Sequence, residues 1–126
     1  MLSKGILIID DDEDIRVQLK AALEAEGYSV HAEANGKTAL DYLTGLNPDH
    51  LPCCIILDLM MPEMTGAQFL DIIANSYKES LGKIRIIIAS AKGSPVKPGT
   101  ISPNAQTVSK PFDLDELYSV LEKHCI

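Results

Sequence analysis

Three aspartates stand directly after apolar runs of the sequence and could do chemistry together. Asp10 and Asp11 follow residues 6–9, and Asp58 follows residues 55–57. Continuous apolar runs of this kind are typical of parallel strands that are covered on both faces. Because ligands of open α/β sheets bind at the carboxyl ends of such strands, we expect the three carboxylates to share one sheet edge. A hard cation such as Mg²⁺ would relieve their mutual repulsion.

A hydroxyl and an ammonium group are expected at the same edge. Ser90 follows the apolar run 84–89, and Lys110 follows the short, weakly strand-like segment 105–109. Carboxylates, a metal ion, a hydroxyl and a lysine together suit a phosphoryl group, whose oxygens carry charge that the metal and the lysine offset. Asp58 could then be the nucleophile and form an aspartyl phosphate. Each residue alone also fits a helix cap, a turn or a surface charge, so the prediction depends on their placement at separate strand ends.

The first half of the chain alternates strand and helix patterns. Apolar residues repeat with helical spacing after the acidic run 10–14, and Gly27 is a natural end for that helix. Residues 28–33 alternate apolar and polar, which indicates a strand nearer an edge. Asn35 could cap the next helix.

The second half continues this alternation with one irregular segment. A helix is expected after Gly66, and a last one begins where Asp113 and Glu116 resemble a capping box. Between them, residues 92–104 hold three prolines and two glycines, which argue against a regular helix. Residues 1–126 are therefore predicted to form one α/β domain, a three-layer sandwich around a parallel sheet.

Composition argues against several classes of protein. The net charge of −7, from 18 acidic and 11 basic residues, disfavours binding to nucleic acid. No apolar run approaches the roughly 20 residues that a membrane span needs, and the N-terminus does not resemble a signal peptide. Three cysteines, an odd number without a CxxC pair, indicate reduced thiols and a cytoplasmic location.

Four motifs follow one another along the chain, at residues 6–12, 55–66, 87–91 and 110–112. Together they resemble the receiver domains of two-component response regulators over essentially the whole chain. The resemblance implies a flavodoxin-like, doubly wound sheet of five parallel strands in the order 2-1-3-4-5. It also implies a phosphorylation-dependent signalling switch that receives its phosphoryl group from a sensor histidine kinase or a histidine phosphotransfer protein. Such a protein assists its own phosphorylation and dephosphorylation and is not otherwise an enzyme.

The resemblance assigns a role to each candidate residue. Asp58 matches the phospho-acceptor, Ser90 the hydroxyl that turns toward the phosphoryl group, and Lys110 the lysine that pairs with its oxygens. The Mg²⁺ ligands are expected to be Asp58, the acids Asp10 and Asp11, and the backbone carbonyl of Met60.

Two features depart from the family pattern. Thr107 stands where an aromatic residue is usual, three positions before Lys110. The usual fourth helix would fall in residues 92–104, where we expect it to be missing or reduced to a turn. Both changes put the usual route of the output signal in doubt, but the phosphorylation chemistry uses other residues.

Other classes of site fit the sequence less well. Residues 36–38 suggest a P-loop, but His31 stands where that motif needs glycine. The scattered histidines argue against zinc, and the acidic edge argues against a flavin phosphate. The spacing of Asp10 and Asp12 suits a haloacid-dehalogenase-type phosphatase, which usually needs a longer chain with a cap.

Within the receiver interpretation, three roles stay open. The start at Met1 and the short C-terminus favour a stand-alone receiver over one excised from a larger regulator or hybrid kinase. A scaffold that works by phosphorylation-independent binding is the third, and the complete set of site residues argues against it. The downstream target cannot be inferred from the sequence.

Overall fold

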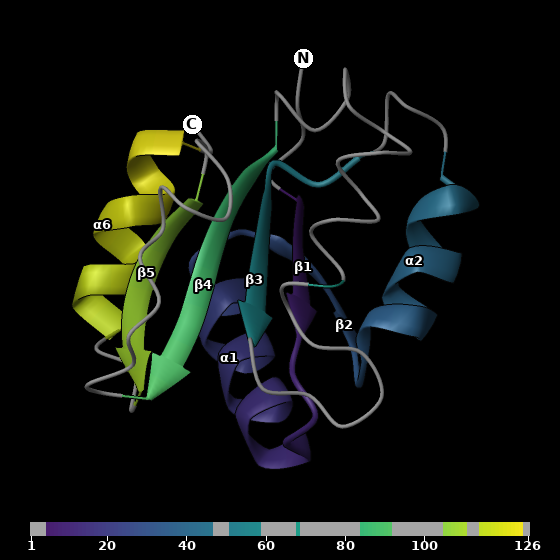
Figure 1. Ribbon diagram of the computed structural model, residues 1–126. Helices are drawn as coiled ribbons and strands as arrows, with labels where there is room; N and C mark the ends of the chain where they lie inside the picture. Colours follow the sequence, from purple (N-terminus) through teal and green to yellow (C-terminus); the bar gives the residue numbers. More distant parts are fainter. Residues whose placement is uncertain are drawn as a thin grey trace.

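The structure, a computed structural model, describes residues 5–46, 51–58, 68, 84–91, 105–110 and 114–124. For residues 90–91, 105–110 and 123–124 it describes the backbone alone. Within these ranges, strands and helices follow one another as the sequence predicts, and Figure 1 shows helices on both sides of a central sheet.

All five described strands run parallel, in the predicted order β2-β1-β3-β4-β5. Every residue of β3 is buried, as expected for an apolar strand in the middle of a covered sheet. β2 is more exposed and lies at one edge, which confirms the prediction from its alternating pattern. The carboxyl ends meet at the lower edge of the sheet in Figure 1. The bounds are Gly5–Ile9 (β1), Ser29–Glu33 (β2), Cys54–Asp58 (β3), Arg85–Ala91 (β4) and Ala105–Lys110 (β5).

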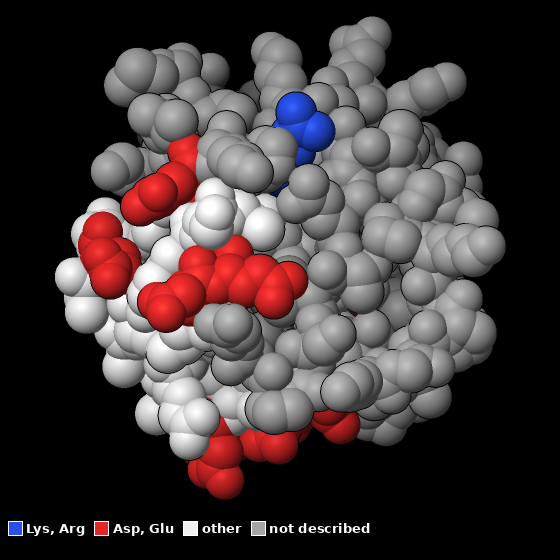
Figure 2. Space-filling model, turned by 90° about the vertical axis from the view of Figure 1, so that its left-hand side faces the viewer, with Lys and Arg blue, Asp and Glu red and all other residues white. Residues whose placement is uncertain are grey.

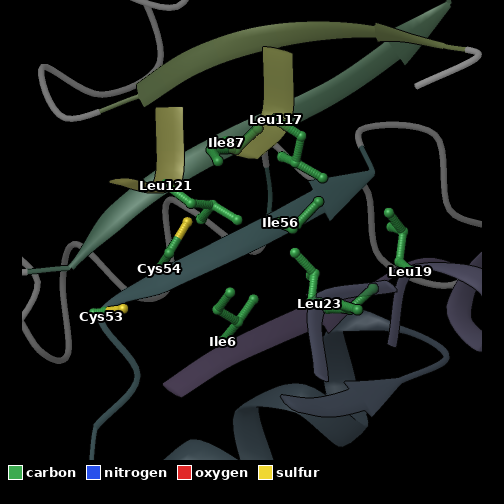
Figure 3. Close-up of a cluster of buried hydrophobic side chains, with 10 residues drawn as sticks. Ile6, Leu19, Leu23, Cys53, Cys54, Ile56, Ile87, Leu117 and Leu121 are labelled. Carbon is green, nitrogen blue, oxygen red and sulfur yellow. The ribbon is translucent and has the colours of Figure 1, made fainter. Parts of the chain in front are cut away.

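Three described helices cover the two faces of this sheet. They are α1 (Glu13–Ala25), α2 (Gly36–Thr44) and α6 (Leu114–His124). Leucines of α1 and α6 pack with Ile56 and its neighbours on one face, and Figure 3 shows these side chains meeting. α2 packs with Leu7 and its neighbours on the other face. None of these helices has the length and apolar character of a membrane span.

Local sequence fixes the helix ends. Asp12 caps α1 by accepting the backbone N–H of Asp14 at 2.9 Å, and Asn35 caps α2 in the same way through Thr38 at 2.9 Å. After α1, Gly27 has a φ of 94°, a left-handed conformation that residues with a side chain rarely adopt. The predicted cap at Asn35 and the predicted stop at Gly27 are confirmed.

Several predictions lie outside the described residues. They are the loss of the fourth helix in 92–104, the cap at Asp113, and most of the helix after Gly66, of which only Gln68 is described and is helical.

The prediction of three reduced thiols is wrong for Cys53. Cys53 is disulfide-bonded, whereas Cys54 is free and buried. An odd cysteine count gives no sign of which thiols the fold brings together, so composition alone could not show this bond. The expectation of a cytoplasmic location loses this part of its support.

Candidate functional site

The three predicted aspartates do lie together. One carboxylate oxygen from each of Asp10, Asp11 and Asp58 can be chosen so that all lie within 4.8 Å of one another. The residues Asp10 and Asp58 are 2% and 6% exposed, and Asp11 is exposed. The cluster therefore has a buried floor of two carboxylates and one carboxylate open to solvent.

Strand register explains this proximity. Ile9 of β1 stands opposite Leu57 of β3, so Asp10 and Asp58 are the next residues along two neighbouring strands. The apolar residues before them are buried, as expected for strands in the middle of a covered sheet. The chain then turns from β1 into α1, which leaves Asp11 on the solvent side of the cluster.

Hydrogen bonds fix the loop between β1 and α1. The N–H of Asp10 donates to the carbonyl of Glu33 in β2 at 3.2 Å. The N–H of Asp12 donates to Oδ1 of Asp10 at 2.9 Å, and Asp12 in turn caps α1. The acidic run is therefore divided between two tasks, since Asp12 supports the helix while Asp10 and Asp11 face the cluster.

Arg16 joins this loop and was missed by the sequence analysis. Nη1 of Arg16, in the first turns of α1, donates to the backbone carbonyl of Asp10 at 2.7 Å. A basic residue six positions after Asp10 was the available signal. That signal is weak, because a long side chain in a helix could equally point into solvent.

Ser90 and Lys110 are placed at the same edge by their backbones. Asp58 stands opposite Ala89 in β4, so Ser90 follows directly. Lys110 is the last residue of β5 and pairs with Ala91. The directions of their side chains are not described, and Met60 lies outside the described residues.

The carboxylates suit a magnesium ion. Mg²⁺ prefers oxygen ligands at about 2.1 Å, so oxygens on opposite sides of one ion lie about 4.2 Å apart. A separation of up to 4.8 Å needs only a small side-chain adjustment, or a water between one carboxylate and the ion. Among the described residues on the side of the molecule that carries α6, Figure 2 shows more acidic than basic side chains.

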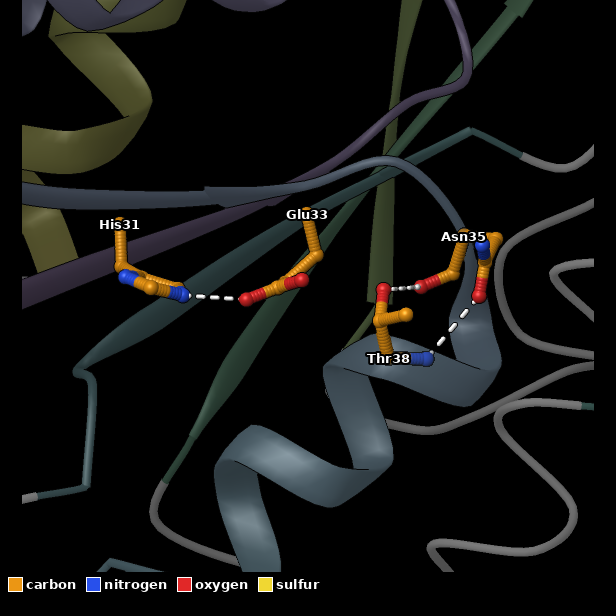
Figure 4. Close-up of polar contacts among 4 residues, drawn as sticks. All are labelled: His31, Glu33, Asn35 and Thr38. Atoms are coloured by element: carbon orange, nitrogen blue, oxygen red, sulfur yellow. Dashed lines mark hydrogen bonds and ion pairs between the residues drawn. The ribbon is translucent and has the colours of Figure 1, made fainter.

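A second polar cluster lies elsewhere, on β2 and α2. His31 pairs with Glu33 and stacks on Tyr42 with ring centroids 3.7 Å apart (Figure 4 shows the pair). A cavity of about 240 Å³ beside His31 is lined by the first residues of β1 and β2. It therefore opens at the amino ends of these strands, opposite the aspartates, and does not belong to the candidate site.

Comparisons with known proteins agree with this arrangement. Residues 6–122 match the family model described as the response regulator receiver domain. The chain is 32% identical over 126 residues to sporulation initiation phosphotransferase F of Bacillus subtilis, covering 98% of this chain and 95% of that protein. It is 30% identical to the regulatory protein AtoC of Escherichia coli over 94% of this chain, which is only 24% of AtoC.

Solved structures share the fold. The receiver domain of the Francisella response regulator 1452 matches with a TM-score of 0.76 and 28% identity, covering 94% of this chain and 93% of that one. The chemotaxis protein CheY4 of Vibrio cholerae matches with a TM-score of 0.81 over 98% and 99% of the two chains. At 24% identity, the CheY4 match supports the fold alone.

Proposed function

The chain belongs to the family of response regulator receiver domains, and on that premise we propose that Asp58 accepts a phosphoryl group from a phosphohistidine. The donor is a sensor histidine kinase or a histidine phosphotransfer protein. The observation that carries the proposal is the convergence of Asp10, Asp11 and Asp58 at the carboxyl ends of β1 and β3.

The transfer exchanges one bond of phosphorus for another. An oxygen of the Asp58 carboxylate forms a bond to phosphorus while the P–N bond of the phosphohistidine breaks, and the imidazole nitrogen leaves with the electron pair. The burial of Asp58 supports this role, because a buried side chain has less freedom to turn away from the phosphorus. Mg²⁺, when bound by Asp10 and Asp11 with Asp58 and the carbonyl of Met60, offsets the charge on the phosphoryl oxygens.

Two further residues would read the modification. Lys110 would pair with the phosphoryl oxygens and Ser90 would turn its hydroxyl toward them. Support comes from the register, because β4 pairs with the Asp58 strand β3, β5 pairs with β4, and both strands end at the same edge of the sheet as Asp58. The added charge of about −1.5 to −2 would shift the equilibrium between two conformations of the loops after these strands.

The test is phosphorylation without a partner protein. We expect acetyl phosphate and Mg²⁺ to add the mass of one phosphoryl group, and chelation of Mg²⁺ or Asp58→Asn to abolish the gain. Asp41→Asn is the matched control, because it makes the same chemical change on the exposed surface of α2. An unmodified native protein would contradict the proposal and favour the scaffold role.

The comparisons offer two settings for such a switch. The relative matched over 95% of its length is named a phosphotransferase, which favours a shuttle that passes the group to another protein. AtoC, of which the chain covers 24%, favours a receiver module of a larger regulator. Transfer of the phosphoryl group from the phosphorylated protein to a histidine phosphotransfer domain would support the shuttle. A cytoplasmic location is part of the same proposal.

A further inference from the structure

We propose that Arg16 is a positioning residue that holds Asp10 in its metal-binding arrangement. The inference deepens the proposed function, since it concerns the Mg²⁺ that the phosphorylation needs. It rests on the hydrogen bond of 2.7 Å from the guanidinium of Arg16 to the carbonyl of Asp10.

This hydrogen bond connects α1 to the loop between β1 and α1. Asp10 is tied to β2 through its N–H, and to the loop through its Oδ1, which accepts the N–H of Asp12. The carbonyl of Asp10 is anchored by Arg16, so the peptide group between Asp10 and Asp11 cannot rotate freely. Rotation of this peptide would move the carboxylate of Asp11 relative to those of Asp10 and Asp58.

Arg16 is itself held in place by α1. Its backbone N–H donates to the carbonyl of Asp12 at 3.1 Å, in the first hydrogen-bonded turn after the cap. The side chain is half-buried and spans from this turn back to the end of β1. Helix, loop and strand are therefore connected through one guanidinium group, which donates to the carbonyl in a charge-assisted hydrogen bond.

Charge and position make opposite predictions for this residue. A positive group near three carboxylates competes with a bound cation, so its removal should by itself strengthen Mg²⁺ binding. A positioning role predicts the reverse, because groups that orient metal ligands typically contribute 10- to 100-fold to metal affinity. The direction of the change therefore separates the two roles.

The experiment compares Arg16→Met with Lys20→Met. Both variants remove one positive charge from α1 and keep a long apolar side chain, but Lys20 is exposed and one turn further from the loop. We expect Arg16→Met to weaken Mg²⁺ binding about tenfold relative to Lys20→Met, measured by amide NMR titration of metal-free protein with Mg²⁺. Arg16→Lys should recover part of the loss, because its ammonium group keeps a charged donor. Equal or tighter binding by Arg16→Met would overturn the inference.

A second measurement separates this inference from the proposed function. In metal-free protein, the amide of Asp12 should exchange with solvent at least severalfold faster in Arg16→Met than in Lys20→Met. The amide of Thr38, which bonds to Asn35 in the cap of α2, should exchange equally in both. If the native protein binds no Mg²⁺, the proposed function fails, and the exchange of Asp12 alone decides whether Arg16 positions the loop. Unchanged exchange of Asp12 would then overturn it.

Discussion

At the scale of single residues, neighbouring acids of the same type have different roles. Asp10 is buried beside Asp58, Asp11 is exposed, and Asp12 is occupied in capping α1. Their roles follow from where β1 ends and α1 begins. A side chain one position further along the chain faces a different partner, so substitutions within this run should not be interchangeable.

The buried thiol of Cys54 leads to a prediction of how the stability of the protein depends on pH. Burial raises the pKa of its thiol from 9.0 to about 12, while a backbone hydrogen bond from Ile87 acts in the opposite direction. The folded protein therefore keeps a proton that the unfolded chain releases above 9.0. Its contribution to the free energy of unfolding is complete below pH 9.0 and is lost as the pH rises toward about 12.

Urea unfolding at a series of pH values checks this prediction. Cys54→Ala should be less stable than the native protein at neutral pH, because it leaves a small cavity, but its stability should decline less between pH 9.0 and about 12. Tyr28 also contributes to the loss of stability at alkaline pH. Burial, and to a smaller extent the negative charge of Glu122, raises the pKa of its phenol. Tyr28→Phe therefore measures how much of the alkaline loss of stability is due to Tyr28 and not to Cys54. An identical decline in Cys54→Ala and native protein would contradict the prediction.

At the scale of elements, two glycines at helix ends should respond oppositely to the same substitution. Gly27 has a φ of 94°, so Gly27→Ala should destabilise the protein by about 1–2 kcal/mol through backbone strain. Among the described residues other than its chain neighbours, none has an atom within 4 Å of the added carbon at Gly27, so the expected cost is conformational.

Gly45→Ala is the matched control. Gly45 ends α2 with a φ of −83°, and an added carbon would lie 3.6 Å from the nearest backbone oxygen, an ordinary contact. This variant should be neutral or gain up to about 1 kcal/mol from the restricted unfolded chain. Thermal unfolding of both variants measures the difference. Equal effects would show that the turn after α1 relaxes around alanine.

Element patterns also explain which parts of the site could be predicted. The runs before Asp10 and Asp58 are apolar without interruption, so they predicted central strands and hence a shared edge, which the structure confirms. Arg16 could not be predicted, because its contact depends on how α1 is rotated relative to the loop. The bond at Cys53 could not be predicted either, because the cysteine count does not show which thiols the fold brings together. The roles of Ser90, Lys110 and Met60 stay predictions.

At the scale of the whole molecule, bound Mg²⁺ should stabilise the fold. A ligand at 100 times its dissociation constant adds about 2.7 kcal/mol to the free energy of unfolding. We expect the melting temperature to rise with Mg²⁺ concentration, while Na⁺ at equal ionic strength serves as the control for screening.

Asp11→Asn should change the thermal stability of both the metal-free and the Mg²⁺-bound protein. Without metal it should melt above the native protein, because one of three crowded carboxylates has lost its charge. With Mg²⁺ it should gain less than the native protein, because an amide replaces one of the three carboxylates proposed to bind the ion. A native-like gain in Asp11→Asn would mean that the stabilising ion binds elsewhere on this acidic surface.

The pairing of β1 with β3 also affects when, during synthesis and folding, the protein becomes able to accept a phosphoryl group. The contact between Gly5 and Cys53 joins positions 48 residues apart, and Asp58 lies beyond it. Such long-range pairing forms late and slowly in folding, because a long loop must close first. A chain emerging from the ribosome therefore holds Asp10 and Asp11 well before Asp58 can join them. Nascent and partly folded chains would be poor acceptors, and signalling would be restricted to molecules that have completed folding.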